Sequence, residues 1–164
     1  MDIGIGLNTD DVVSGNIGSK KQMNYTIIGD GVNLAARLES ACKQYGAHIL
    51  VSEFTYKQLR GTYYSRELDF VVVKGKTQPV AIYEILDYHT EESYPHMSDA
   101  LRYFKSGLAK YRQRKWPEAA KEFQDVLALN ANDKAAKLYI ERCRHLAENP
   151  PGDDWDGVWV MESK

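Results

Sequence analysis

The sequence predicts an α/β or α+β layer followed by a region made almost wholly of helices. Three observations support this fold class. Up to residue 88, short apolar runs typical of strands alternate with amphipathic stretches typical of helices. From residue 98 onward, nearly every segment has helical periodicity. Between them, residues 89–97 form a polar stretch with one proline, and this composition predicts a linker.

The first region is predicted to open with a strand over Ile3–Leu7, where glycine alternates with an apolar residue. The bare glycine face is expected to let another backbone approach closely. Val12-Val13 and then Gly15–Gly18 predict a turn-rich stretch. Tyr25–Ile28 predicts a second strand, because aromatic and β-branched residues favour strands.

A helix is predicted over Val32–Tyr45, with Asp30 as its N-cap and Gly46 as the residue that ends it. Its apolar stripe follows helical spacing and consists of Val32, Ala35, Leu38 and Cys42. The later elements are predicted to be a strand at His48–Val51, a short helix at Glu53–Leu59, and two strands at Phe70–Val73 and Val80–Leu86 joined by a turn.

Residues 98–148 have the spacing of one tetratricopeptide unit, a helix–turn–helix repeat, followed by a helix over Lys134–Ala147. The positions that fit its packing pattern are Ala100, Tyr103, Gly107, Trp116, Ala119, Phe123 and Leu127, with a closing turn at Asn130–Asp133. Such units need about three stacked copies to bury a core. This single one is therefore expected to pack on the first region or on another chain. Residues 149–164 form a tryptophan-containing tail, in which Trp155–Met161 is apolar enough to dock on another surface.

Composition narrows the class of protein. The chain has 164 residues, of which 43% are hydrophobic and 27% charged, a globular balance that excludes global disorder. The net charge of −2 argues against a nucleic-acid or anionic-membrane surface. No apolar run approaches the ~20 residues of a membrane span, and no basic leader precedes the first strand. Cys42 and Cys143 are predicted to be free thiols. We therefore expect a cytoplasmic chain, with a membrane anchor in a longer parent protein left open.

Three stretches carry a resemblance to a known family: Ile5–Thr9, Val12–Gly18 and, above all, the uninterrupted run Tyr25–Glu39. They resemble the catalytic domain of class III nucleotidyl cyclases, the adenylate and guanylate cyclase family. Val73–Lys76 is similar to the terminal hairpin of that domain. The likeness covers about residues 2–88, and the arrangement with its helical tail looks most like cyanobacterial adenylate cyclases. The resemblance implies an α+β fold, the C-terminal half of a ferredoxin-like cyclase domain over residues 1–88, before the tetratricopeptide-like hairpin.

Asn33 and Arg37 are the candidate catalytic residues. They are four positions apart on the predicted helix, so their side chains share one face. An amide can form a hydrogen bond with a ribose oxygen, and a guanidinium can donate two parallel hydrogen bonds to a phosphate. The resemblance implies that Asn33 orients the ribose, that Arg37 stabilises the charged transition state, and that Lys74 binds the outer phosphates. A plain solvated helix face is the alternative for the first pair, and a solubility residue in a turn is the alternative for Lys74.

Base selection is expected to depend on Thr26, which the resemblance places against the purine. A threonine hydroxyl can accept a hydrogen bond from the adenine amino group, which favours ATP over GTP. The alternative is a threonine present for its strand propensity. His48 and His145 have no partner at metal-ligand spacing and are predicted to be structural.

The resemblance also implies that half of the site lies elsewhere. The first half of the family's domain carries two metal-binding aspartates that have no counterpart in this sequence. No metal ligand is therefore predicted here, and Asp10 and Asp11 are not expected to serve. The Mg²⁺ or Mn²⁺ ions would take their ligands from the missing half or a partner chain, because the family's sites form between two subunits.

These observations predict an adenylate cyclase fragment in intracellular signalling. ATP would be converted to 3′,5′-cyclic AMP and diphosphate, and the fragment would be inactive alone. Its partner would be a second copy of the chain, as a homodimer, or a complementary cyclase half. The alternative is a non-catalytic protein-interaction or dimerisation module that acts through the helical region, with a protein partner docked on it. Nucleic acid is not an expected partner.

Overall fold

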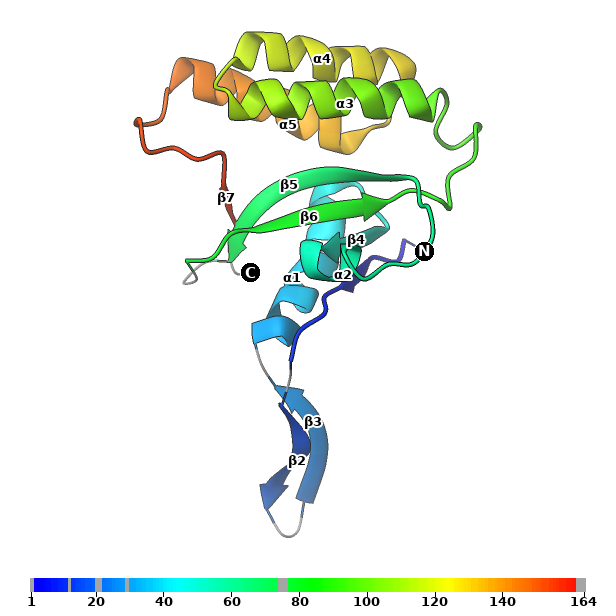
Figure 1. Cartoon of the computed structure of the whole chain (residues 1–164), viewed down its shortest axis with the longest axis vertical. Helices are drawn as coiled ribbons and strands as arrows, with labels where there is room; N and C mark the ends of the chain where they lie inside the picture. The colour runs from blue at the N-terminus through cyan, green and yellow to red at the C-terminus, as the bar shows by residue number, and fades with distance from the viewer. Residues whose placement is uncertain (1, 12, 20–21, 29, 74–76, 162–164) are drawn as a thin grey trace.

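The computed structural model describes residues 2–11, 13–19, 22–28, 30–73 and 77–161, and its architecture is α+β, as predicted (Figure 1). A curled five-stranded sheet has the order β1-β4-β6-β5-β7. Its strands are β1 (Ile5–Leu7), β4 (Ile49–Ser52), β5 (Ser65–Val73), β6 (Val80–Ile85) and β7 (Trp159–Met161). The β1–β4 and β5–β7 pairs are parallel, whereas β6 runs antiparallel to both of its neighbours.

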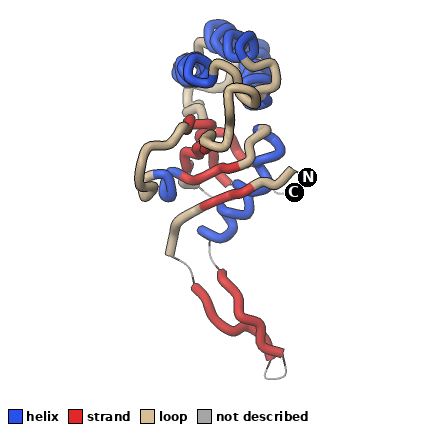
Figure 2. The backbone as a smooth tube through the Cα atoms, turned by 90° about the vertical axis from the view of Figure 1, so that its right-hand side faces the viewer, coloured by secondary structure: helices blue, strands red, loops and turns tan. Residues whose placement is uncertain are grey.

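A two-stranded hairpin projects away from this sheet (Figures 1 and 2). It consists of β2 (Val13–Ser19) and β3 (Gln22–Ile28), paired antiparallel from Val13↔Ile28 to Ser19↔Gln22. The turn-rich stretch predicted over Gly15–Gly18 is therefore wrong. Glycine lowers strand propensity, but the cross-strand ladder with β3 outweighs that local preference.

Helix α1 (Asp30–Tyr45) packs against β1 and β4, and the glycines of β1 make this close packing possible. A Cβ on Gly6 would lie 2.3 Å from the backbone nitrogen of Glu39 and 2.5 Å from the carbonyl oxygen of Ala35. The helix ends where Gly46 adopts a φ of +66°, as predicted for the residue that follows it. The predicted close approach of another backbone to this strand is confirmed.

The helical region consists of α3 (Met97–Arg112), α4 (Trp116–Leu129) and α5 (Lys134–Glu148), which pack on one another in that order. Ala100, Ala119 and Phe123 are fully buried, and Gly107 lies against the ring of Phe123. The region covers the sheet, with α3 touching β5 and α5 touching α1. Of the two expected packing surfaces, the first region or another chain, the structure shows contacts with the first region.

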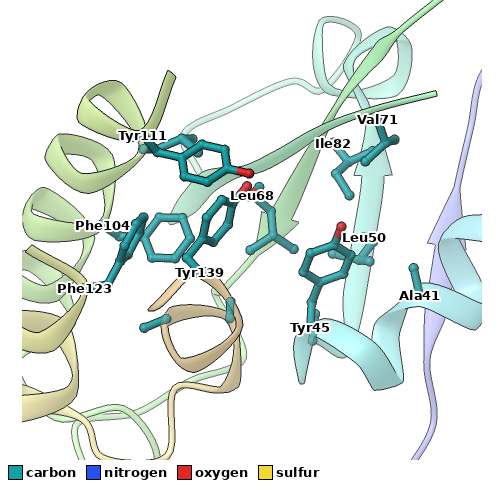
Figure 3. Packing of buried hydrophobic residues seen from close by; sticks show 14 of the residues in the cluster. Ala41, Tyr45, Leu50, Leu68, Val71, Ile82, Phe104, Tyr111, Phe123 and Tyr139 are labelled. Atoms are coloured by element: carbon teal, nitrogen blue, oxygen red, sulfur yellow. Dashed lines mark hydrogen bonds between the residues drawn. The ribbon is translucent and has the colours of Figure 1, made fainter. Parts of the chain in front are cut away.

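One cluster of buried side chains joins the sheet to the helices (Figure 3). Its fully buried members include Leu38 of α1, Leu50 of β4, Ile82 of β6, Phe104 of α3 and Tyr139 of α5. A short helix, α2 (Glu53–Tyr56), follows β4. Cys42 and Cys143 are buried free thiols, as predicted. Across the described ranges, no helix combines the length and the apolar character needed to cross a bilayer.

Candidate functional site

Helix α1 carries the two candidate catalytic residues on neighbouring turns. Asn33 is exposed and Arg37 is half-buried. Among the described residues, neither side chain makes a hydrogen bond or ion pair. Both polar groups are thus available to a ligand, and the spacing predicted from the sequence places them one turn apart on the same face.

A hydrogen-bonded anchor holds the N-terminal end of this helix. The Asn8 amide nitrogen donates to the carbonyl oxygen of Gly31 at 3.0 Å, and the Ser52 hydroxyl donates to the Asn8 amide oxygen at 2.6 Å. Ser52 in turn accepts from the backbone of Thr55 as the N-cap of α2. The first turn of α1, two residues before Asn33, is therefore tied to the end of β4. Sequence reasoning missed Asn8, although it lies within the family-like stretch Ile5–Thr9.

Thr26 and Lys74, the candidate substrate-binding residues, are placed less fully. Thr26 lies in β3 opposite Gly15, on the strand that leads into α1. Lys74 lies outside the described residues. Val73, which precedes it, is the last residue of β5 and pairs with Met161 of β7. The structure therefore brings Asn33 and Arg37 together and leaves the contributions of Thr26 and Lys74 as expectations.

An open groove of about 1250 Å³ runs beside the C-terminal half of α1. Arg37 lines it together with Lys43, Lys134 and the β7 residues Trp159 and Met161. Strand β7 thus forms a wall of the groove that contains a candidate catalytic residue. The sequence indicated only that this segment is apolar, because a three-residue strand has no periodicity to detect.

The described residues do not fit a metal pair. Among them, no group of three His, Cys, Asp or Glu side chains is arranged to hold an ion. The Asp10 carboxylate accepts a hydrogen bond from the backbone of Asp11 at 2.8 Å, which is a local turn contact. Asp10 also lies against Gly31, where an added Cβ would be 2.6 Å from the Asp10 Cβ.

A buried charged cluster lies at the opposite end of α1. Arg142 of α5 donates to Asp69 of β5 at 2.7 Å, and the Tyr45 hydroxyl of α1 donates to the same carboxylate oxygen at 2.5 Å. Burial raises the pKa of Tyr45 far above its ordinary value, so its hydroxyl stays protonated and donates. Burial alone would lower the pKa of Arg142, but the charge of Asp69 outweighs it and raises that pKa.

A second buried ion pair joins the helical region to the sheet. Arg66 of β5 donates to Glu84 of β6 at 2.8 Å and to Asp133, the N-cap of α5, at 2.7 Å. Burial opposes ionisation of Asp133, but Arg66 outweighs it and holds the pKa of that carboxyl below its ordinary value. Burial raises the pKa of Glu84, against the opposing effect of Arg66. Arg66, Glu84 and Asp133 are not among the residues that line the groove.

Comparisons with known proteins identify relatives of this chain. The adenylate cyclase of Anabaena cylindrica is 39% identical over 88 residues, covering 52% of this chain and 18% of that protein. The "Adenylate cyclase, terminal-differentiation specific" of Dictyostelium discoideum is 35% identical over 147 residues, covering 87% of this chain and 7% of that protein. The second match extends beyond residue 87 into the helical region. The chain spans less than a fifth of the length of either relative.

A solved structure, the adenylyl cyclase CyaB from P. aeruginosa, is 40% identical with a TM-score of 0.43. The match covers 51% of this chain and 42% of that one. The profile of the family described as "Adenylate and Guanylate cyclase catalytic domain" matches residues 1–87, which is more than half of the sequence. The chain therefore belongs to the adenylate and guanylate cyclase catalytic domain family.

Proposed function

We propose that this chain supplies the ribose-binding and transition-state-binding half of an adenylate cyclase site. The observation that carries the proposal is the presentation of Asn33 and Arg37 one turn apart on α1, with both side chains uncommitted among the described residues. The reaction would convert ATP to 3′,5′-cyclic AMP and diphosphate. The adenylate cyclases of Anabaena and Dictyostelium among the relatives support ATP as the substrate.

The proposed chemistry is an intramolecular displacement. The ribose 3′-oxygen attacks the α-phosphorus, a new phosphoester bond forms, and the bond to the leaving diphosphate breaks. Because attack requires the oxygen in line with that leaving group, the Asn33 amide would hold the ribose in the reactive orientation. Negative charge grows on the phosphoryl oxygens during the step. The Arg37 guanidinium, already fixed on a helix, would stabilise that charge.

Two further residues would complete this half of the site. Thr26 would accept from the adenine amino group through its hydroxyl and so select the base. Lys74 would bind the outer phosphates. The Mg²⁺ or Mn²⁺ ligands would come from another chain or segment, since the described residues do not gather a metal site. The chain alone is then expected to be inactive, and to become active beside a second chain that supplies two aspartates.

The test is cyclic AMP production, measured by mass spectrometry with ATP and Mn²⁺ or Mg²⁺. The purified chain is assayed alone and then mixed with a class III cyclase half that carries both metal-binding aspartates. Arg37→Ala and Asn33→Ala should each lower the activity of the mixture by about 10²–10³-fold, since each removes one preorganised group. Lys105→Ala, an exposed cation on α3 that does not line the groove, serves as the control and should retain activity.

Two results would overturn the proposal. Product from the chain alone that disappears in Arg37→Ala would show that the missing aspartates are dispensable. A mixture whose activity is unchanged by Arg37→Ala would show that this chain contributes no catalytic group. The second result would favour the alternative, a non-catalytic interaction module that acts through the helical region.

A further inference from the structure

Helix α5 of the helical region holds the C-terminal end of α1. Tyr45, Asp69 and Arg142 form what we call the α1 clamp, and no more than 6% of any of the three residues is exposed. Asp69 accepts from both Tyr45 and Arg142 through one oxygen, while its other oxygen accepts from the backbone of Phe70. In Figure 3, Leu68, the neighbour of Asp69 on β5, lies between Tyr45 of α1 and Tyr139 of α5.

A second contact joins the same two helices. The Lys134 ammonium, in the first turn of α5, donates to the carbonyl oxygen of Lys43 at 2.6 Å. An ammonium at this point is favourable, because the last carbonyls of a helix carry the negative end of its dipole. Beside it, a Cβ on Gly46 would lie 2.6 Å from the Lys134 Cβ. The chain leaving α1 therefore passes directly against α5.

The same arginine also orders β7. The Arg142 guanidinium carbon lies 3.9 Å from the centre of the Trp159 ring, and Trp159 pairs with Val71 of β5. A guanidinium stacked on an indole is attracted by the ring as well as packed on it. Because Trp159 lines the groove that contains Arg37, Arg142 supports two walls of that groove at once, α1 and β7.

We propose that α5 is a positioning element of the cyclase site and that Arg142 is its positioning residue. Through the α1 clamp it fixes the helix that carries Asn33 and Arg37, and through Trp159 it fixes β7, which lines the same groove. The proposal rests on the function proposed above. The helical region thereby acquires a role in the site. A partner protein that shifts α5 would also shift α1, because the buried hydrogen bonds of the clamp are all made in one arrangement and tightly packed side chains move together.

The Arg66 ion pair provides a matched control within the same molecule. Arg142 and Arg66 are both buried arginines, and each pairs at 2.7 Å with an aspartate across the junction between sheet and helical region. Arg66 binds Glu84 of β6 and Asp133 at the start of α5. Its link to α1 runs only indirectly, through Asp133 and the neighbouring Lys134, whereas Arg142 shares the Asp69 carboxylate with Tyr45 of α1.

The experiment compares Arg142→Lys with Arg66→Lys in the full chain. Lysine keeps the positive charge, so neither aspartate is left beside a neutral group. It lacks the paired N–H donors and the planar face of the arginine guanidinium. Trp159→Ala is the third variant, in case Arg142→Lys does not fold. Hydrogen–deuterium exchange followed by mass spectrometry measures the backbone protection of α1, with peptides from α4 as the internal reference. Isothermal titration calorimetry with ATP measures ligand affinity.

We expect Arg142→Lys to speed hydrogen exchange in α1 by about tenfold. Trp159→Ala should speed exchange at Val71–Val73 by about tenfold. Each variant should also weaken ATP binding severalfold. Arg66→Lys should change both quantities clearly less than Arg142→Lys does. Equal effects of Arg142→Lys and Arg66→Lys on α1, or no effect of Arg142→Lys there, would overturn the proposal. A mixture with the complementary cyclase half whose cyclic AMP production is unchanged by Arg37→Ala would overturn the proposed function instead. The exchange pattern would then decide by itself whether Arg142 holds α1.

Discussion

At the scale of single residues, the position of α1 depends on the absence of a side chain at Gly6. A Cβ there would lie within 2.5 Å of two backbone atoms of α1, and a helix backbone cannot move aside locally as a flexible side chain can. Gly6→Ala should therefore lower the free energy of unfolding by about 1–3 kcal/mol, the usual cost of overpacking. Urea denaturation measures it.

Gly152→Ala is the matched control for this substitution. Its added Cβ would meet only the Asp154 carboxylate, the far end of an exposed side chain. We expect a change within about 0.5 kcal/mol, as for ordinary surface substitutions. Equal losses in the two variants would show that the close contact between β1 and α1 is not what Gly6 provides.

The sequence could nominate some candidate site residues and not others. Asn33 and Arg37 could be nominated because they stand four apart within a long family-like run on a recognisable helix. Arg142 could not, because its partners Asp69 and Tyr45 lie far away in the sequence and nothing local distinguishes it from a surface arginine. A buried ion pair is created by tertiary packing, and a pattern of 3.6-residue periodicity carries no information about it.

At the scale of elements, α5 begins at a residue with two roles. Asp133 caps the helix by accepting from the backbone of Ala136 at 3.1 Å, and it forms the buried pair with Arg66. Asp133→Ala should cost about 3–5 kcal/mol of unfolding free energy, because it removes the cap and leaves a buried charge short of a partner. Thermal and urea unfolding followed by circular dichroism measure the loss.

Asp125→Ala on α4 provides the comparison for that variant. Asp125 pairs with Lys121 one turn away on an exposed helix surface, and such pairs contribute about 0.3–0.5 kcal/mol. Comparing the two variants thus separates the contribution of a buried ion pair to the free energy of unfolding from that of a surface ion pair. If Asp133→Ala were as mild as Asp125→Ala, the junction between α5 and the sheet would owe little to this ion pair.

Element types were predicted better than element contacts. The sequence predicted α1, β6 and α5 nearly to their ends, because each has clear periodicity or a strong breaker such as Gly46. Of β5 it predicted only Phe70–Val73. It failed for β2, where glycines concealed a strand whose stability comes from its partner β3. It could not place β7, because a short apolar segment pairs with whichever edge the folded sheet presents.

At the scale of the whole molecule, buried tyrosines predict sensitivity to alkali. Burial raises the pKa of Tyr111 from its ordinary 10 to about 12. As the pH rises, the Tyr111 hydroxyl therefore loses its proton at a lower pH in the unfolded chain than in the folded one. The contribution of this hydroxyl to the free energy of unfolding is complete below pH 10 and declines as the pH rises toward 12. The unfolding free energy of the wild type should fall by about 1.4 kcal/mol between pH 9 and pH 11 from this residue alone.

Tyr111→Phe tests this expectation, since phenylalanine keeps the ring against Tyr139 and Trp155 and removes the titrating hydroxyl. Urea unfolding at pH 7, 9, 10 and 11 should give a shallower decline for the variant. Tyr63→Phe, at an exposed ring, should decline as the wild type does. Identical slopes for all three proteins would contradict the assignment of the alkaline loss to Tyr111.

The parallel pairing of β5 with β7 sets an order of events during folding. All three helices of the helical region lie between these strands in the chain, so the pair closes a very long loop. Contacts between residues so far apart form late, and chains that depend on them fold slowly. During synthesis, β5 is therefore made with its outer edge unpaired, and the residues of β7 that cover this edge are made much later. Until β7 pairs with it, the exposed edge of β5 can pair with a strand of another chain, which is a route to aggregation.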